Sequence, residues 1–170
     1  MSTSYRRILV PIDGSPTATR GLDEAIALCK ATGGSIRVLH VMDDLVFVSG
    51  FESGATYARD VVPQLRKRSE QLLEAGRKRA EAAGVPADQV LVECFARRTS
   101  EIVCEQAIAW RADLIVVGTH GRRGVRRMML GSDAEQIVRE APVPVLVVRA
   151  PEAAVATAAR ATAPAVTAIA

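Results

Sequence analysis

The sequence predicts an α/β fold: an open, doubly wound parallel sheet of five strands with helices on both faces, Rossmann-like in plan. Five short apolar runs, rich in β-branched residues, alternate with longer segments in which apolar residues recur at helical spacing. Most of these runs do not alternate with polar residues, which is typical of strands covered on both faces. The first strand–helix–strand unit spans residues 7–41 and requires a parallel pair joined by a right-handed crossover.

The first strand is expected over residues 7–12. The helix that follows should begin with Ser15 as its N-cap and Pro16 in its first turn, because both residue types favour a helix start. Gly33 should end this helix, and the second strand is expected over residues 36–41. The face of the helix that contacts the sheet is predicted to consist of Ala18, Leu22, Ala25, Ile26 and Cys29.

The middle of the chain predicts a long loop, a helix and a strand. Residues 42–59, with two glycines and two serines, predict the loop, and loops of this length are often functional. Residues 60–83 predict a helix whose charged outer face includes the basic run 66–68, and residues 90–95 predict the third strand. The inner stripe of this helix is expected to consist of Val62, Leu65, Leu72, Ala75 and Ala83.

The strand order decides where a ligand would bind. In open α/β sheets the ligand lies beyond the carboxyl ends of the strands, where the strand order reverses. If the order is 3-2-1-4-5, the turn at 13–15 and the loop at 118–131 face the same crevice, although the sequence alone does not prove that order. The remaining predicted elements are a helix over 100–110 capped by Thr99 or Ser100, a strand over 114–117, a helix over 133–141 and a strand over 144–148.

The loop after the fourth strand has the composition of an anion site. Its glycines let backbone N–H groups approach a ligand closely. The sequence from Ser132 to Glu135 then matches a capping box that opens a helix, whose first N–H groups and partial positive charge attract phosphate. The loop also contains four cationic side chains: Arg122, Arg123, Arg126 and Arg127.

Composition limits the class of protein. The 170 residues predict one domain at 1–149 and an alanine-rich tail at 150–170 that has no amphipathic stripe and is expected to be disordered. The net charge of +3, without a basic–aromatic stripe, does not indicate a nucleic-acid partner. No leader peptide and no membrane-spanning run is predicted, so the cytoplasm is the expected compartment. Three cysteines without a metal-binding or disulfide pattern are expected to be buried thiols: Cys29, Cys94 and Cys104.

Four segments together resemble the universal stress protein family. Gly118-Thr119-His120-Gly121, followed after nine residues by Gly131-Ser132, matches the family pattern G-x-x-G-x9-G-[S/T]. A lone glycine motif would be weak, but the segments occur in the right order and the resemblance covers about residues 5–149. The other three segments are VPIDGS at 10–15, VLHV at 38–41 and PVPVLVV at 142–148.

The resemblance implies a homodimeric stress-response protein that binds an adenine nucleotide, ATP or AMP. Asp13 would meet the ribose hydroxyls, while Pro11 and Val41 would line the adenine. The last strand, Val145–Val148, would pair with its copy in a second subunit, which agrees with the tendency of an open apolar edge strand to associate. The phosphates would lie against residues of the glycine loop: Gly118, His120, Gly121, Arg122, Gly131 and Ser132.

Several of these residues have a second interpretation. Asp13 can cap the turn before the first helix, and His120 can be a surface histidine without a function. His40 is expected to be a packed or solvent-edge residue at the end of its strand. Asp133 places negative charge on the helix turn that faces the phosphates, and it either weakens triphosphate binding or recruits Mg²⁺.

The expected activity is binding. The chain has no P-loop signature, and the sequence identifies neither a nucleophile nor a general base, so at most slow ATP hydrolysis is expected. We therefore expect a nucleotide-binding regulator or sensor. Two alternatives are an interaction protein of the same fold that binds no nucleotide, and an adenylyl-transferring or electron-transferring enzyme of a related superfamily.

Overall fold

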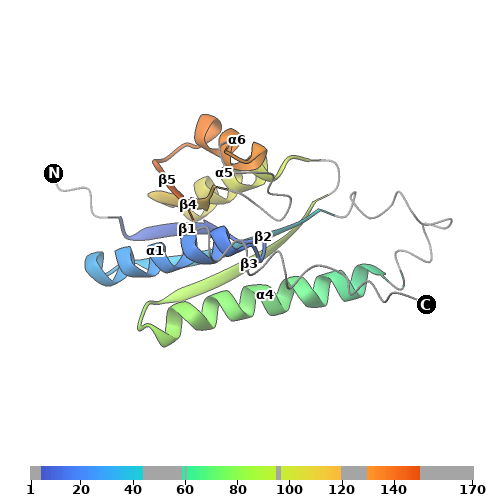
Figure 1. Ribbon diagram of the computed structural model, residues 1–170, viewed down its shortest axis with the longest axis horizontal. Coiled ribbons are helices and arrows are strands. Elements are labelled where there is room, and N and C mark those ends of the chain that lie inside the picture. Colours follow the sequence, from blue (N-terminus) through green and yellow to red (C-terminus); the bar gives the residue numbers. More distant parts are fainter. Residues whose placement is uncertain (1–4, 44–58, 60, 95–96, 120–129, 150–170) are drawn as a thin grey trace, which may run out of the picture.

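The computed structural model describes residues 5–43, 59, 61–94, 97–119 and 130–149. Its centre is a five-stranded parallel sheet in the order β3-β2-β1-β4-β5, which confirms the predicted order (Figure 1). The strands are β1 (Arg7–Pro11), β2 (Ser35–Asp43), β3 (Ala87–Cys94), β4 (Leu114–Gly118) and β5 (Val145–Val148). The helices are α1 (Pro16–Thr32), α4 (Val62–Ala82), α5 (Thr99–Trp110) and α6 (Ser132–Glu140).

Helices cover both faces of the sheet, as a doubly wound fold requires (Figure 1). Because side chains alternate along a strand, each strand contributes to two separate cores. The core under α1 and α4 includes Ile8, Val10, Ile36, Val38, Leu114 and Val116. The core under α5 and α6 includes Leu9, Leu39, Ile115, Val117, Val103 and Ile137.

The ends of α1 agree with the sequence. The Ser15 side chain accepts a hydrogen bond from the Ala18 N–H at 3.2 Å, and Pro16 occupies the first turn. Gly33 ends the helix with φ +70°, a left-handed conformation that glycine adopts without a steric penalty. All five apolar residues predicted for the inner face of this helix are buried.

The predicted inner stripe of α4 is partly wrong. Ala75 is exposed, whereas the buried residues of the helix are Ser69, Leu73, Gly76 and Ala80. Most of these are small, and an ideal Cβ at Gly76 would lie 3.2 Å from the side chains of Ile12 and Val38. The helix therefore approaches the sheet through small residues, which a search for large apolar residues does not detect.

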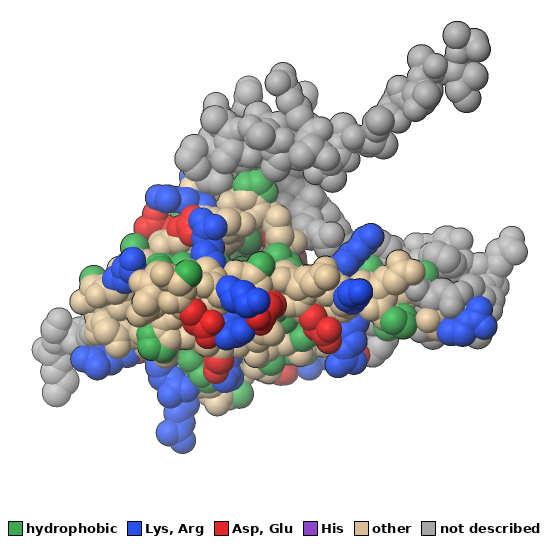
Figure 2. Space-filling view, turned by 90° about the horizontal axis from the view of Figure 1, so that it is seen from below, with side chains coloured by type: hydrophobic (Ala, Val, Ile, Leu, Met, Phe, Trp, Pro, Cys, Tyr) green, Lys and Arg blue, Asp and Glu red, His purple; other side chains and the backbone are tan. Residues whose placement is uncertain are grey.

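The basic run 66–68 on α4 is solvent-exposed, as predicted. Arg66 forms ion pairs with Glu70 at 3.2 Å and with Glu93 of β3 at 2.9 Å. Figure 2 shows basic and acidic side chains interspersed over the face of the molecule that it presents. This surface is a mixed, solvated one, and we assign no binding role to it.

Two predicted helix starts are wrong. α5 begins at Thr99 with Arg98 as its N-cap, which makes no side-chain capping bond. α6 begins at Ser132 with Gly131 as its N-cap, so the predicted capping box does not form and Ser132 is the first helical residue. The extended conformation of Gly131 (φ −60°, ψ 148°) and the bond from the Glu135 N–H to its carbonyl, 2.9 Å, define this start.

Three strands are longer than predicted, and β4 exceeds its predicted range only by Gly118. β3 begins at Ala87, three residues before the predicted start. The prediction missed these residues because polar side chains interrupt the apolar pattern there. One of these polar residues, Asp88, accepts two hydrogen bonds from Arg37 of β2, at 2.8 and 2.6 Å. β2 extends through Asp43, into the predicted loop at 42–59. The rest of that loop, apart from Arg59, and the predicted disordered tail at 150–170 lie outside the described residues.

The cysteines largely agree with the prediction of buried thiols. Cys29 and Cys94 are buried, Cys104 is half-buried, and all three are free. Burial raises the pKa of the Cys29 thiol to about 11, with a smaller contribution from the negative charge of Asp113. Cys29 therefore belongs to the core beneath α1. In the described part of the chain, no helix is both long and apolar enough to cross a membrane.

Helix α1 comes very close to the sheet where it crosses the end of β4. An ideal Cβ at Gly118 would lie 2.7 Å from the carbonyl carbon of Thr17 and 2.8 Å from the Ala18 nitrogen. These are backbone atoms, which cannot rotate away. On the helix side, an ideal Cβ at Gly21 would lie 3.7 Å from the Gly118 nitrogen, an ordinary contact. Only the glycine on the strand is sterically required.

We predict that Gly118→Ala lowers the free energy of unfolding by about 1–3 kcal/mol, because the added methyl group must displace helix backbone. Gly21→Ala is the matched control, since it faces the same contact from the helix. It should leave stability unchanged or raise it by up to about 1 kcal/mol through better helix propensity. Urea denaturation followed by circular dichroism measures both, and equal stability of the two variants would contradict the steric argument.

Candidate functional site

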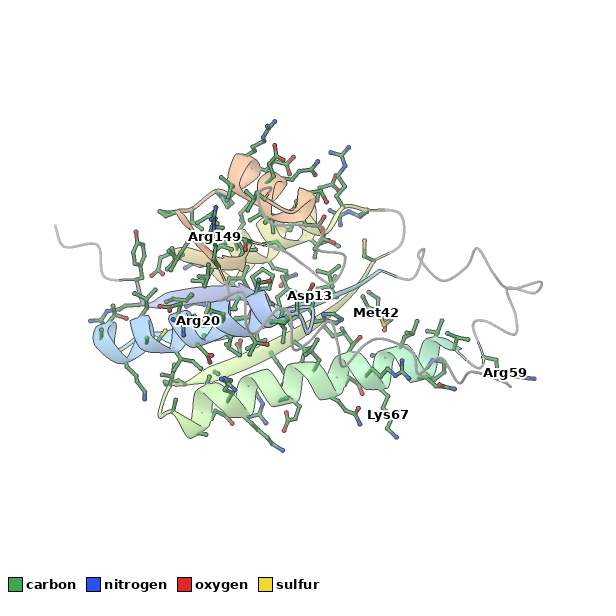
Figure 3. The ribbon with its side chains drawn as sticks, in the orientation of Figure 1. Asp13, Arg20, Met42, Arg59, Lys67 and Arg149 are labelled. Atoms are coloured by element: carbon green, nitrogen blue, oxygen red, sulfur yellow. The ribbon has the colours of Figure 1, made fainter. Side chains whose placement is uncertain are left out.

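The candidate site lies at the carboxyl ends of β1 and β4, where the strand order reverses. β1 pairs with β2 on one side and with β4 on the other, and Leu9 lies opposite Ile115. The next residues of these strands therefore leave the sheet side by side. Figure 3 shows Asp13 and Met42 at the same end of the sheet, where β1 and β2 finish. This is the usual ligand position in open α/β sheets.

The turn between β1 and α1 is ordered by its own side chains. One carboxylate oxygen of Asp13 accepts a hydrogen bond from the Ser15 N–H at 2.9 Å, and Gly14 adopts φ +83°. The Ser15 and Thr17 hydroxyls lie 3.2 Å apart and are buried. Asp13 thus has the capping role that the sequence allowed.

The end of β4 connects to α6 through backbone hydrogen bonds. The Thr119 N–H donates to the Val148 carbonyl of β5 at 2.9 Å, and the Thr119 carbonyl accepts from the Gly131 N–H at 2.8 Å. The chain therefore leaves β4 and returns to α6 at the same point. The Gly131 N–H is used in this bond, so the N–H groups that α6 cannot satisfy within itself are those of residues 132–134.

Two helix N-termini meet at the end of β4. The N-terminus of α1 packs against Gly118, and the N-terminus of α6 is joined to the residue after β4 by the hydrogen bond between Gly131 and Thr119. Each N-terminus carries about half a positive charge, so their convergence favours an anion. The first turn of α1 has no acidic residue, whereas that of α6 has Asp133 and Glu135. At the start of α1, however, the Asp13 carboxylate accepts a hydrogen bond from the Ser15 N–H, so both N-termini have acidic side chains beside them.

His40 contacts the turn that carries Asp13. It is 7% exposed, and its Nδ1 lies 2.6 Å from the Ile12 carbonyl oxygen. Of the two expected positions for His40, packed or at the solvent edge, the structure shows the packed one. The sequence alone indicates that His40 needs such a contact, because a polar residue in an otherwise apolar strand must find a hydrogen-bond partner when it is buried.

The structure places six of the predicted site residues and brings them to one end of the sheet. Pro11 ends β1, Val41 lies in β2 and is half-buried, and Ser132 is exposed on the first turn of α6. The others are Asp13, Gly118 and Gly131. His120, Gly121 and Arg122 lie outside the described residues.

Metal ligation has no support in the described residues, because no group of three or more His, Cys, Asp or Glu side chains is placed to hold an ion there. What the described site can offer a ligand is helix N–H groups, a carboxylate and an apolar strand end. That combination suits a molecule with an anionic end, hydroxyl groups and a flat apolar part.

Comparison with known proteins identifies the family. The model of the universal stress protein family matches residues 4–149. Universal stress protein MJ0531 of Methanocaldococcus jannaschii is 33% identical over 148 residues, which are 87% of this chain and 84% of that protein. The solved structure of hypothetical protein MJ0577 is 25% identical, with a TM-score of 0.74, and the match covers 88% of this chain and 99% of that one.

Two further solved structures have the same fold and contain nucleotides. A universal stress protein in complex with cAMP is 23% identical, with a TM-score of 0.61, over 86% of this chain and 98% of that one. The universal stress protein of Archaeoglobus fulgidus in complex with dAMP is 20% identical, with a TM-score of 0.60, over 86% and 99%. The family model and the relative from M. jannaschii span the sheet and its helices, so this chain belongs to the universal stress protein family.

Proposed function

We propose that the protein binds an adenine nucleotide, ATP or AMP, at the carboxyl ends of β1 and β4 and acts as a homodimeric stress-response regulator or sensor. The convergence of the α1 and α6 N-termini on the end of β4 carries this proposal. A phosphate group satisfies helix N–H groups that have no partner within the helix. Asp13, on the adjacent turn, provides a carboxylate for ribose hydroxyls.

The residues divide into four roles. Asp13 accepts hydrogen bonds from the ribose, and Pro11 and Val41 line the adenine. Gly118 brings α1 close to the end of β4. Gly131 leaves space for the phosphates, while the backbone N–H and the hydroxyl of Ser132 bind them. This assignment refines the expected role of Gly131, whose own N–H is donated to Thr119.

Two structures of the same fold support the choice of ligand. One is described as a complex with cAMP and the other as a complex with dAMP, and both ligands are adenine nucleoside monophosphates. Membership of the family and the geometry of the described residues extend this chemistry to the present chain. Hydrolysis is expected to be slow at most. Efficient phosphoryl transfer needs a positioned attacking water, and we identify no residue for that role among the described ones.

The proposed dimer forms through β5, which is an edge strand. The Pro144 carbonyl accepts a hydrogen bond from Ile115 of β4 at 3.0 Å, and the Val148 carbonyl accepts one from Thr119, just after β4, at 2.9 Å. Backbone groups alternate in direction along a strand, so those of Val145 and Val147 point away from the sheet. Leu146 is 37% exposed. An apolar edge with outward-directed backbone groups favours pairing with a second copy.

We predict that AMP or ATP raises the melting temperature of the protein by roughly 5–10 °C at 100 times its Kd, a stabilisation of about 2.7 kcal/mol. In Gly131→Val most of this shift should be lost, because a branched side chain occupies the space for the phosphates. The backbone of residue 131 is extended and accepts any residue, so the variant should fold. Thermal-shift titration measures both.

Ala82→Val is the control for this experiment, because it adds a similar side chain at an exposed position at the end of α4. It should respond to nucleotide like the wild type. An equal response of Gly131→Val and the wild type would show that the phosphates bind elsewhere. The absence of any shift in the wild type would favour an interaction protein with an empty site.

We predict that Asp13→Asn weakens AMP binding about tenfold or more, since the ribose hydroxyls lose a charged acceptor. Asparagine keeps an oxygen that can accept from the Ser15 N–H, so the turn should persist. Binding of 2′,3′-dideoxy-AMP, which lacks the hydroxyls, should change little. Isothermal titration calorimetry with both ligands checks this, and an equal loss for the two would contradict the ribose role.

We predict that Leu146→Lys shifts the protein from dimer to monomer, because it places charges on an edge that must associate. Ile108→Lys is the matched control, since Ile108 is another exposed apolar residue, at 64% exposure, on α5. Light scattering coupled to size-exclusion chromatography gives the mass of each variant. A wild-type protein that is monomeric at high concentration would contradict the proposed dimer.

A further inference from the structure

The His40 imidazole donates a hydrogen bond to the chain just before Asp13. The Ile12 carbonyl oxygen, 2.6 Å from Nδ1, can only accept. The proton must therefore be on Nδ1, whether the ring is neutral or charged. This carbonyl belongs to the peptide group that joins Ile12 to Asp13. The orientation of that peptide determines the direction in which the Asp13 side chain leaves the backbone.

Consecutive residues of β2 hold both backbone groups of Ile12. Its N–H donates to the Leu39 carbonyl at 2.8 Å, as a continuation of the β1–β2 ladder. Its carbonyl accepts from the side chain of His40. The imidazole thus replaces a ladder bond at the point where the chain leaves the sheet. A buried carbonyl without a hydrogen-bond partner is unfavourable, so this bond favours one orientation of the turn.

Helix α4 packs against the same turn. An ideal Cβ at Gly76 would lie 3.2 Å from the side chains of Ile12 and Val38, and one at Gly14 would lie 3.7 Å from the side chain of Leu72. The turn is therefore bounded by helix side chains, while its direction is set by the bonds to β2. Packing alone does not require an imidazole in this strand, because Met42, two residues further along β2, is buried as an apolar side chain.

We infer that His40 is a positioning residue of the nucleotide site: through Nδ1 it orients the Ile12–Asp13 peptide and so aims the Asp13 carboxylate at the ribose. The inference rests on the proposed nucleotide function. Sites in which supporting hydrogen bonds hold a binding side chain avoid the cost of ordering it on binding. His40 is expected to affect recognition of the ribose hydroxyls, and to leave the adenine and phosphate contacts largely unchanged.

The test compares three substitutions at position 40. His40→Phe keeps the ring volume but removes the donor. His40→Asn places an amide near the position of Nδ1, and His40→Gln places one nearer the position of Nε2. Calorimetry with AMP and 2′,3′-dideoxy-AMP gives the preference for the ribose hydroxyls. We expect this preference to fall about tenfold in the phenylalanine and glutamine variants and to recover in the asparagine variant.

Two outcomes would overturn the inference. A purely structural role would lower the affinity for both nucleotides by the same factor, and the preference would stay at the wild-type value. An asparagine variant no better than the glutamine variant would show that the Nδ1 position does not matter. If the phenylalanine variant does not fold, the comparison of asparagine with glutamine still decides. In a double variant with Asp13→Asn, His40→Phe should cause no further loss of preference.

A measurement without ligand separates this inference from the proposed function. The ¹⁵N spectrum of the free protein should show a protonated Nδ1 at His40. The chain has two histidines, so His120→Gln assigns the signal. An unprotonated Nδ1 would overturn the inference whatever the protein binds. A protonated Nδ1 in a wild type that binds neither nucleotide would refute the proposed function, and with it the role of His40 in ribose recognition.

Discussion

The approach of α1 to the end of β4 is the constraint on which the site depends. Gly118 has no side chain, so the backbone of Thr17 and Ala18 can lie directly against the strand. This contact brings the N-terminus of α1 over the switch point, where the bond from Gly131 to Thr119 already holds α6. The convergence of the two helix N-termini thus arises from packing. The glycine is required for steric reasons even without a ligand.

The fold could be predicted because its signals are local and repeated. Buried parallel strands and the caps of α1 were visible in the sequence. The strand order was predicted but not proved by the sequence, and the structure confirms it. The failures occurred where contacts between elements decide. Ser69 and Gly76 are buried on α4 because the helix lies close to the sheet, and Ala75 is exposed, although its type suggested otherwise.

The candidate site could be predicted in part. The turn at Asp13 and the end of β4 were correctly predicted to lie at the same end of the sheet, because the carboxyl ends of parallel strands lie together. The capping role expected for Ser132 belongs to Gly131, since a helix start depends on backbone angles that an S-x-x-E spacing does not determine. The contact of His40 with Ile12 joins positions 28 residues apart, and only the folded chain reveals it.

The bond between Thr119 and Gly131 has a consequence for variation in the chain. It joins the end of β4 directly to the start of α6, so these two elements are held together at this point. Lengthening a segment with fixed ends costs little entropy, about 0.6 kcal/mol for each doubling. Insertions between these two residues should therefore be tolerated by the scaffold. The length of this connection is therefore the part of the fold that is freest to vary.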